Sequence, residues 1–216
     1  MKILVIDIGG TNVKLKLSDS DEVRKFPSGP GLSPSFLMEG IKNVAGDWEF
    51  DGVSIGYPGP VVREVILQEP VNLGRGWVDF NFEGAFGKPV KLCNDAAMQA
   101  LGSYDGARML FLGLGTGLGT TLIIDGVVAP MELGHLPYKK KMSFEDYVGN
   151  AGRLRLGNKK WQAVVHDVVT RLKHALVADY VVLGGGNVKK LSELPPGCRA
   201  GSNVNAFVGG VRMWQE

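Results

Sequence analysis

Two glycine-rich turns of similar shape constrain the fold of this chain more than any other sequence feature. The first is Gly9-Gly10-Thr11, which follows an apolar run ending at Ile8, and the second occupies residues 113–121 (GLGTGLGTT). Apolar and β-branched residues flank both turns, so each pattern predicts a strand, a tight turn and a second strand. Glycine lets the backbone approach a ligand closely, and consecutive amides can then converge on an anion. The pair predicts two cradles that can hold one polyphosphate from both sides.

Neither turn has the sequence of the common phosphate-binding loops. A P-loop requires GxxxxGK[ST] between a strand and a helix, and a dinucleotide fingerprint requires GxGxxG at the start of a helix. Here the glycines join strand to strand, and threonine hydroxyls near them can add donors to the backbone amides. These hydroxyls belong to Thr11, Thr116, Thr120 and Thr121. One glycine hairpin is usually structural, whereas two of matching form favour a ligand site.

The composition excludes several classes of protein. With 216 residues, 44% apolar and 21% charged, the chain can form one large domain or two small lobes. A net charge of +2 is too small to indicate binding to nucleic acid or to an anionic membrane. No run reaches the roughly 18 apolar residues of a membrane span, and Asp7 comes too early for a signal peptide, so we expect a cytoplasmic protein. Cys93 and Cys198 have no metal-ligand spacing, which predicts reduced thiols and no structural zinc.

The order of predicted elements repeats along the chain. Strands are predicted at 2–8, 13–17, 52–56, 89–92, 109–114, 120–124, 127–129 and 180–183. Asp125-Gly126 predicts a two-residue hairpin turn. A helix is predicted at 33–44, with a serine cap and an apolar stripe of Phe36, Leu37, Ile41 and Val44. Further helices are predicted at 96–101, from Asn158 as the cap to Leu176, and at about 204–214. A sheet that begins with a glycine hairpin thus occurs twice, which predicts two related α/β lobes with a cleft between them.

Two aspartates end predicted strands. Asp7 lies next to the first turn, where its carboxylate would repel a phosphate unless a cation intervened. It is therefore a candidate Mg²⁺ ligand through water, and the alternative is an aspartate that caps the turn. Asp95 lies between a strand and a helix, the favoured place for site residues in open α/β sheets. It is the candidate base for phosphoryl transfer to an alcohol, and the alternative is a helix cap.

Seven short segments occur in the order found in ROK-family sugar kinases. They are residues 7–11 (DIGGT), 56–60 (GYPGP), 72–73 (NL), 94–96 (NDA), 114–119 (LGTGLG), 132–135 (ELGH) and 183–186 (LGGG). The ordered set resembles this family over nearly the whole chain. The short length, the lack of a cysteine-rich zinc motif and the segment at 181–190 look closer to the branch that contains polyphosphate glucokinases. The resemblance implies the α/β, two-lobed actin-like ATPase (ribonuclease H-like) fold with a central cleft. We expect one lobe at 1–94 plus about 203–216, and the other at 95–202.

The resemblance also assigns roles to residues. Asp95 becomes the general base, and the residues that contact the sugar are Asn72, Asn94, Asp95, Glu132, His135 and Glu145. Contacts to the donor fall on Gly9, Gly10, Thr11, Gly115, Thr116, Gly117, Gly184, Gly185 and Gly186. The implied function is transfer of a phosphoryl group from ATP or polyphosphate to the 6-hydroxyl of glucose or a related hexose, with Mg²⁺ at Asp7. A homodimer is common in the family, and no nucleic acid or membrane partner is expected.

The chain departs from many ROK members after His135. Those members carry a cysteine-rich zinc motif there, whereas residues 139–145 (KKKMSFE) contain no cysteine, so zinc is not expected and His135 is left for the sugar. The lysines at 139–141, 159–160 and 189–190 are either a track for a long polyanion or solvated faces. Other functions left open are a kinase for mannose, fructose or an N-acetyl sugar, a non-catalytic sugar-sensing regulator, and an actin-like scaffold.

Overall fold

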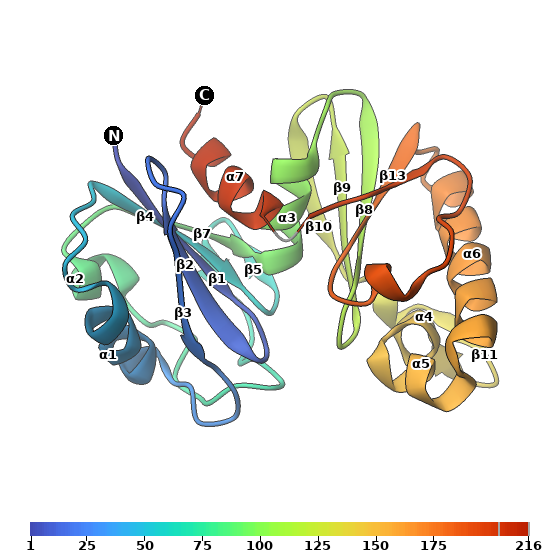
Figure 1. Cartoon of the computed structure of the whole chain (residues 1–216), viewed down its shortest axis with the longest axis horizontal. Helices are drawn as coiled ribbons and strands as arrows, with labels where there is room; N and C mark the ends of the chain where they lie inside the picture. Colours follow the sequence, from blue (N-terminus) through green and yellow to red (C-terminus); the bar gives the residue numbers. More distant parts are fainter. Residues whose placement is uncertain (203, 216) are drawn as a thin grey trace. The chain divides into compact units, whose positions relative to one another are not determined.

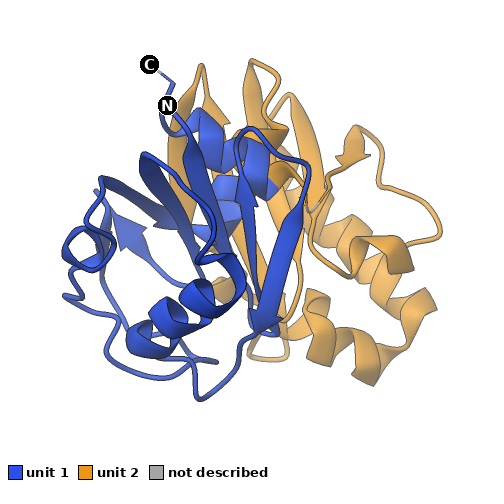
Figure 2. Ribbon diagram, turned by 60° about the vertical axis from the view of Figure 1, so that its left-hand side comes forward, with its two compact units in different colours: residues 1–98, 206–216 blue, residues 99–205 orange. Residues whose placement is uncertain are grey.

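The structure, a computed structural model, describes residues 1–202 and 204–215 (Figure 1). The chain divides into two compact units, residues 1–98 with 206–216, and residues 99–205 (Figure 2). Asn203, near which we expected the chain to return to the first lobe, lies outside the described residues, as does Glu216. No helix within the described ranges is long and apolar enough to span a membrane.

The first unit is built on a five-stranded sheet in the order β3-β2-β1-β4-β7. Its strands are β1 (Ile3–Ile8), β2 (Asn12–Leu17), β3 (Val23–Pro27), β4 (Gly52–Tyr57) and β7 (Val90–Asn94). β1, β2 and β3 pair antiparallel, whereas β4 lies parallel to both β1 and β7. The predicted glycine hairpin is confirmed as β1–β2, and a small hairpin, β5 (Val61–Val62) and β6 (Val65–Ile66), follows β4.

Helices cover both faces of this sheet. They are α1 (Pro34–Ala45), α2 (Phe82–Phe86), the start of α3 (Asp95–Ser103) and α7 (Asn205–Arg212). Leu37 and Ile41 of α1 belong to the core on one face, and Phe207 of α7 packs with Ile3 and Val5 on the other. Ser33 caps α1 as predicted, since its Oγ accepts a hydrogen bond from the amide of Phe36 at 3.4 Å.

The second unit repeats this topology. Its sheet has the order β10-β9-β8-β13-β14, formed by β8 (Arg108–Leu114), β9 (Leu118–Ile124), β10 (Val127–Met131), β13 (Tyr180–Gly184) and β14 (Cys198–Ala200). β8, β9 and β10 are antiparallel, and β13 lies parallel to β8 and β14. The hairpin predicted at Asp125-Gly126 is confirmed, and both turn residues have the positive φ that a type I′ turn requires. The α/β fold with a duplicated sheet agrees with the predicted fold class.

Helices α4 (Phe144–Val148), α5 (Asn150–Leu156) and α6 (Asn158–Ala175) form the other layer of the second unit (Figure 1). Short elements complete it: η1 (Leu133–His135), β11 (Pro137–Lys139), β12 (Met142–Ser143) and η2 (Val188–Lys190). Trp161 and Val165 of α6 pack in one core with Leu110 and Leu112 of β8. The prediction that Asn158 caps α6 is wrong, because Gly157 occupies that position and Asn158 Oδ1 accepts a bond from Arg153 Nη1 at 3.2 Å.

Candidate active-site residues

The first glycine turn is held by its own strands and by the loop that follows β3. The amide of Gly9 donates to the carbonyl of Asn12 at 3.0 Å, which closes the turn. Ser28 binds it from the side, with its amide donating to the Thr11 carbonyl at 3.0 Å and its hydroxyl donating to the Gly9 carbonyl at 2.5 Å. Gly10 and Thr11 remain exposed at the tip. The turn is therefore fixed from behind while its outer face stays accessible.

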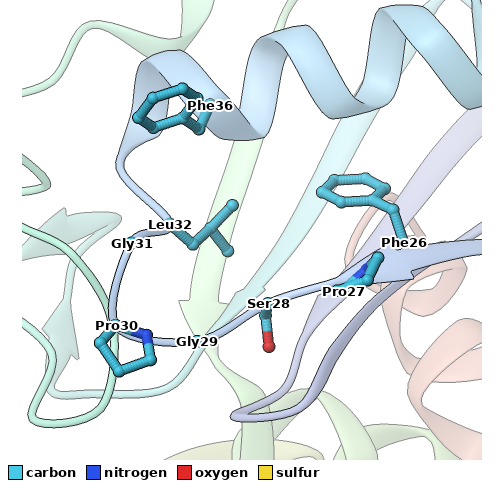
Figure 3. Close-up of a pocket in the computed structure, with 8 residues that line it drawn as sticks. All are labelled: Phe26, Pro27, Ser28, Gly29, Pro30, Gly31, Leu32 and Phe36. Carbon is cyan, nitrogen blue, oxygen red and sulfur yellow. The ribbon is translucent and has the colours of Figure 1, made fainter.

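An apolar pocket lies in the same β3–α1 loop (Figure 3). It encloses about 280 Å³, and its largest side chains are Phe26, Leu32 and Phe36. Phe36, which we expected on the buried stripe of α1, is 60% exposed and borders this pocket instead. None of the site residues predicted from the sequence lines it.

Asp7, the last residue but one of β1, is a buried carboxylate, 4% exposed, and its Oδ2 accepts a bond from Lys14 Nζ at 3.2 Å. The sequence analysis did not identify Lys14 as the partner of Asp7. The signal was the hairpin register, because a turn closed by Ile8 and Val13 places the next pair, Asp7 and Lys14, directly opposite each other. A buried carboxylate requires a nearby cation, and here an ammonium group supplies it.

The carboxylate of Asp7 also fits a Mg²⁺ site. Mg²⁺ prefers oxygen ligands, keeps several waters, and is commonly held by one or two carboxylates together with substrate phosphates. Within the described ranges, no cluster of three or more metal-ligating side chains is present. A Mg²⁺ ion near Asp7 would thus depend mainly on water and on the donor's own phosphate oxygens.

The second glycine turn joins β8 to β9 and is braced by two other segments. The amide of Asn150, at the start of α5, donates to the carbonyls of Gly115 and Thr116 at 3.0 and 3.1 Å. Asn187 binds the same turn, with its Nδ2 donating to Gly115 at 3.0 Å and its amide donating to Leu114 at 3.0 Å. These bonds all lie within the second unit, and they join the turn to the start of α5 and to the segment after β13.

Two of the four threonines expected to offer hydroxyls do not face a ligand. The hydroxyl of Thr120 donates to the Met131 carbonyl at 2.6 Å and accepts from the Leu133 amide at 3.1 Å. Thr121 is fully buried, and its Oγ1 has no partner among the described residues. Thr11 and Thr116 are exposed at the tips of their turns. Sequence reasoning could not separate the two pairs, because alternation along β9 turns both Thr120 and Thr121 into buried layers.

The glycines of the predicted donor site differ in the space around them. A Cβ on Gly184 would overlap the ring of Phe111, and one on Gly117 would overlap the carboxylate of Glu145. A Cβ on Gly9 would lie 3.1 Å from the Asn12 carbonyl, and Gly185 has a φ of +85° with the Leu114 backbone beside it. Internal packing therefore explains Gly9, Gly184 and Gly185, whereas at Gly117 the overlap is only with the end of the flexible Glu145 side chain. In contrast, no described atom lies within 4 Å of a Cβ built on Gly10, Gly115 or Gly186, which leaves room for a ligand.

Glu132, His135 and Glu145 lie together next to the second turn. His135 Nε2 is 3.7 Å from Glu145 Oε1, and Glu145 Oε2 accepts a bond from the amide of Leu118 at 3.3 Å. Burial raises the pKa of Glu132, the Glu145 charge raises it further, and His135 opposes the shift. Two backbone features position this group. Gly134 approaches the Leu118 backbone so closely that a Cβ built on it would lie 2.9 Å from the Leu118 carbonyl oxygen. Helix α4, which carries Glu145, begins with a Ser143–Asp146 capping box.

Asn94 and Asp95 occupy the end of β7 and the start of α3. Asn94 Oδ1 accepts from the amides of Ala96 and Ala97 at 2.9 and 3.1 Å, and its Nδ2 donates to the Gly59 carbonyl at 3.0 Å. Asn94 thus provides the main cap of the helix. Asp95, the first helical residue, accepts from the amide of Ala96 at 2.8 Å. The competing interpretation of Asp95 as the cap is weakened, since the neighbouring asparagine performs that role.

Comparison with known proteins places these residues in a family context. The model of the ROK family matches residues 3–152. The chain is 24% identical over 213 residues to a polyphosphate glucokinase of Mycobacterium tuberculosis, covering 88% of this chain and 80% of that protein.

Solved structures of the same kind share the fold. An inorganic polyphosphate/ATP-glucomannokinase from Arthrobacter aligns over 98% of this chain and 97% of its own, with a TM-score of 0.81 and 22% identity. A ROK family glucokinase from Streptomyces griseus, in complex with glucose and AMPPNP, aligns over 99% of both chains with a TM-score of 0.76 and 15% identity. The predicted actin-like ATPase fold is confirmed by these neighbours.

Proposed function

Because the chain belongs to the ROK family, we propose that it is a hexokinase-type sugar kinase. It transfers a phosphoryl group from ATP or polyphosphate to the 6-hydroxyl of glucose or a related hexose. One observation carries this proposal beyond the family: Glu145 pairs with His135 and also accepts the Leu118 amide of the second glycine turn. A group of carboxylates and an imidazole suited to sugar hydroxyls is thereby attached to a turn suited to phosphate.

The donor is held by backbone amides at glycines where a ligand has room. Gly10, Gly115 and Gly186 are those positions, with Thr11 and Thr116 adding exposed hydroxyls. Lys14, next to Asp7, contributes a positive charge behind the first turn. When bound, Mg²⁺ would neutralise charge on the transferring phosphates, and Asp7 is the residue that would hold it through water.

On the acceptor side, Asp95 takes the proton of the attacking hydroxyl. In phosphoryl transfer the protein supplies mainly position and charge, so one base within reach of the hydroxyl is sufficient. Asn72, Glu132, His135 and Glu145 would hold the remaining hydroxyls. Asn94 keeps one side-chain N–H beyond the bond to Gly59, which it can offer to the sugar.

A coupled assay that crosses glucose, mannose, fructose and N-acetyl sugars with ATP, GTP and polyphosphate tests the function. We expect donor consumption that depends on a hexose, with the 6-phosphate as product. Consumption without any sugar would favour an actin-like ATPase, whereas sugar binding without turnover would favour a sugar-sensing regulator.

Replacement of Gly10 or Gly115 with alanine should raise the KM for the donor about tenfold and leave the melting temperature unchanged. Each added methyl group enters open space, so it costs the fold little but displaces a bound phosphate. Such a loss corresponds to about 1.4 kcal/mol of binding free energy. Gly31→Ala is the matched control, because its Cβ also enters open space outside the predicted site. An unchanged donor KM in both turn variants would contradict the assignment of the donor site.

We also propose a cytoplasmic location and a homodimer, both of which extend the sequence predictions. Light scattering of the purified protein tests the second, with a mass near twice 23.2 kDa as the expected result.

A further inference from the structure

In the loop that carries Asn72, the carboxylate of the first residue, Glu69, binds backbone amides of the last three residues. We infer that Glu69 is a positioning residue that holds the Asn72 loop, residues 69–78, in the shape that binds the sugar. The inference rests on the proposed contact between Asn72 and the sugar. Glu69 itself has no role in the sequence-based assignment of the site.

The carboxylate of Glu69 accepts hydrogen bonds from three consecutive amides. Both of its oxygens lie 3.1 Å from the amide nitrogen of Gly76 and 3.2 Å from that of Trp77, and Oε1 lies 3.4 Å from that of Val78. Hydrogen bonds to a charged acceptor are about twice as strong as neutral ones. These bonds lower the pKa of Glu69 in spite of the opposing effect of burial, so the carboxylate stays charged at neutral pH.

The backbone at Gly76 makes this arrangement possible. Its φ of +94° turns its amide to the same side as the next two, which creates a concave group of donors of the kind that binds anions. Glu69 fills that group from within the chain. Its side chain therefore joins the first residue of the loop to the last three.

The loop has other attachments, but they hold different parts. Leu73 is buried at 7% exposure, the amide of Gly74 donates to the Leu32 carbonyl at 2.9 Å, and the indole of Trp77 donates to the Gly74 carbonyl at 2.9 Å. Tyr57 anchors the preceding residue, Gln68, through a 2.9 Å bond to its carbonyl. Asn72 is exposed and lies in the sequence between Glu69 and the buried Leu73.

The loss of the Glu69 carboxylate would consequently act mainly on the conformation of the loop. The apolar anchors, which include the fully buried Trp77, keep the loop attached to the unit, whereas the amides of residues 76–78 lose their acceptor and the backbone there can move. The position of Asn72 would then vary, and the sugar would have to restore it on binding. Such a defect raises the KM for the sugar and leaves the chemical step and the donor site nearly unaffected.

Kinetics of Glu69→Ala and Glu69→Gln, each beside Glu39→Ala, test the inference. Glu39 is an exposed glutamate on α1 of the same unit and serves as the matched control. We expect the sugar KM to rise about tenfold in Glu69→Ala and less in Glu69→Gln, which keeps one acceptor oxygen. We expect kcat and the donor KM to stay within about threefold of wild type, and Glu39→Ala to match wild type.

Hydrogen exchange of the free protein gives an independent readout. The amides of residues 76–78 should exchange faster in Glu69→Ala than in wild type, while those of α1 should not change. Unaltered exchange at 76–78, or an unaltered sugar KM in an active Glu69→Ala enzyme, would overturn the inference and leave the proposed function intact. A lower kcat together with similar rises in the donor KM and the sugar KM would also overturn it, because that pattern indicates general destabilisation. A wild-type protein that neither binds nor phosphorylates any sugar would instead refute the proposed function on which the inference depends.

Discussion

Asp95→Asn should lower kcat by about 10³-fold while the affinity for the sugar changes little. Asparagine has nearly the same shape as aspartate and can still accept a hydrogen bond, as Asp95 does from the amide of Ala96 at 2.8 Å. It cannot accept the proton of the attacking hydroxyl, and a positioned general base contributes roughly 10²- to 10⁴-fold. The helix should remain intact, because Asn94 provides its main cap. Steady-state kinetics and calorimetric titration with the hexose measure the two effects.

Asp79→Asn is the control for this experiment. Asp79 is an exposed aspartate of the same unit, and its φ of 62° is one that asparagine tolerates well. We expect the control to have the kcat and the melting temperature of wild type. If Asp95→Asn kept more than a tenth of the wild-type kcat, Asp95 would not be the base. If it lost sugar binding as well, its role would lie in holding the sugar.

The second large effect is expected on stability, from Gly185→Ala. The φ of +85° disfavours any residue with a Cβ, which costs roughly 1–2 kcal/mol, and the new methyl group would overlap the backbone of Leu114. Because backbone atoms at the end of β8 must then move, we expect a total loss of roughly 3 kcal/mol. For a chain of this length that lowers the melting temperature by about 10 °C. Thermal unfolding followed by circular dichroism measures it.

The neighbouring residue supplies the matched control. Gly186→Ala places the same methyl group one residue further along, in open space and at an ordinary φ. We expect its melting temperature to equal that of wild type, although its donor KM should rise if the nucleotide side of the donor lies there. Equal melting temperatures for both variants would show that the tight approach of Gly185 to β8 is not required for the fold.

Local patterns predicted the central strands and the longer helices of both units, but not the edge strands β3 and β14 or the short helices α2, α4 and α5. The two glycine hairpins, the Asp125-Gly126 turn and the Ser33 cap follow from backbone rules that act over a few residues. Two local predictions were wrong because packing decided the outcome. Gly157 and not Asn158 occupies the cap position of α6, and Phe36 of α1 borders a pocket in the preceding loop instead of the core.

The candidate site was predictable by residue type and only partly by role. The family resemblance named Asp95, Glu132, His135 and Glu145, and the structure shows that the last three lie together in one unit. The motifs did not reveal which residues would support them. The ion pair of Lys14 with Asp7 follows from hairpin register, whereas the bonds of Glu69 to residues 76–78 depend on a left-handed glycine that no motif marks.

By itself, the sequence determined the strand–turn–strand units, their repetition in two α/β lobes and the family, since these depend on periodicity, on glycine and on short motifs. Only the tertiary structure decided which members of those motifs face a ligand. Thr120 and Thr121 are buried, and Gly184 and Gly185 are tightly packed against other residues. In contrast, there is room for a ligand beside Gly10, Gly115 and Gly186. The physical reason is that space and hydrogen-bond partners at one residue come from segments distant in the chain, and a local pattern carries no record of them.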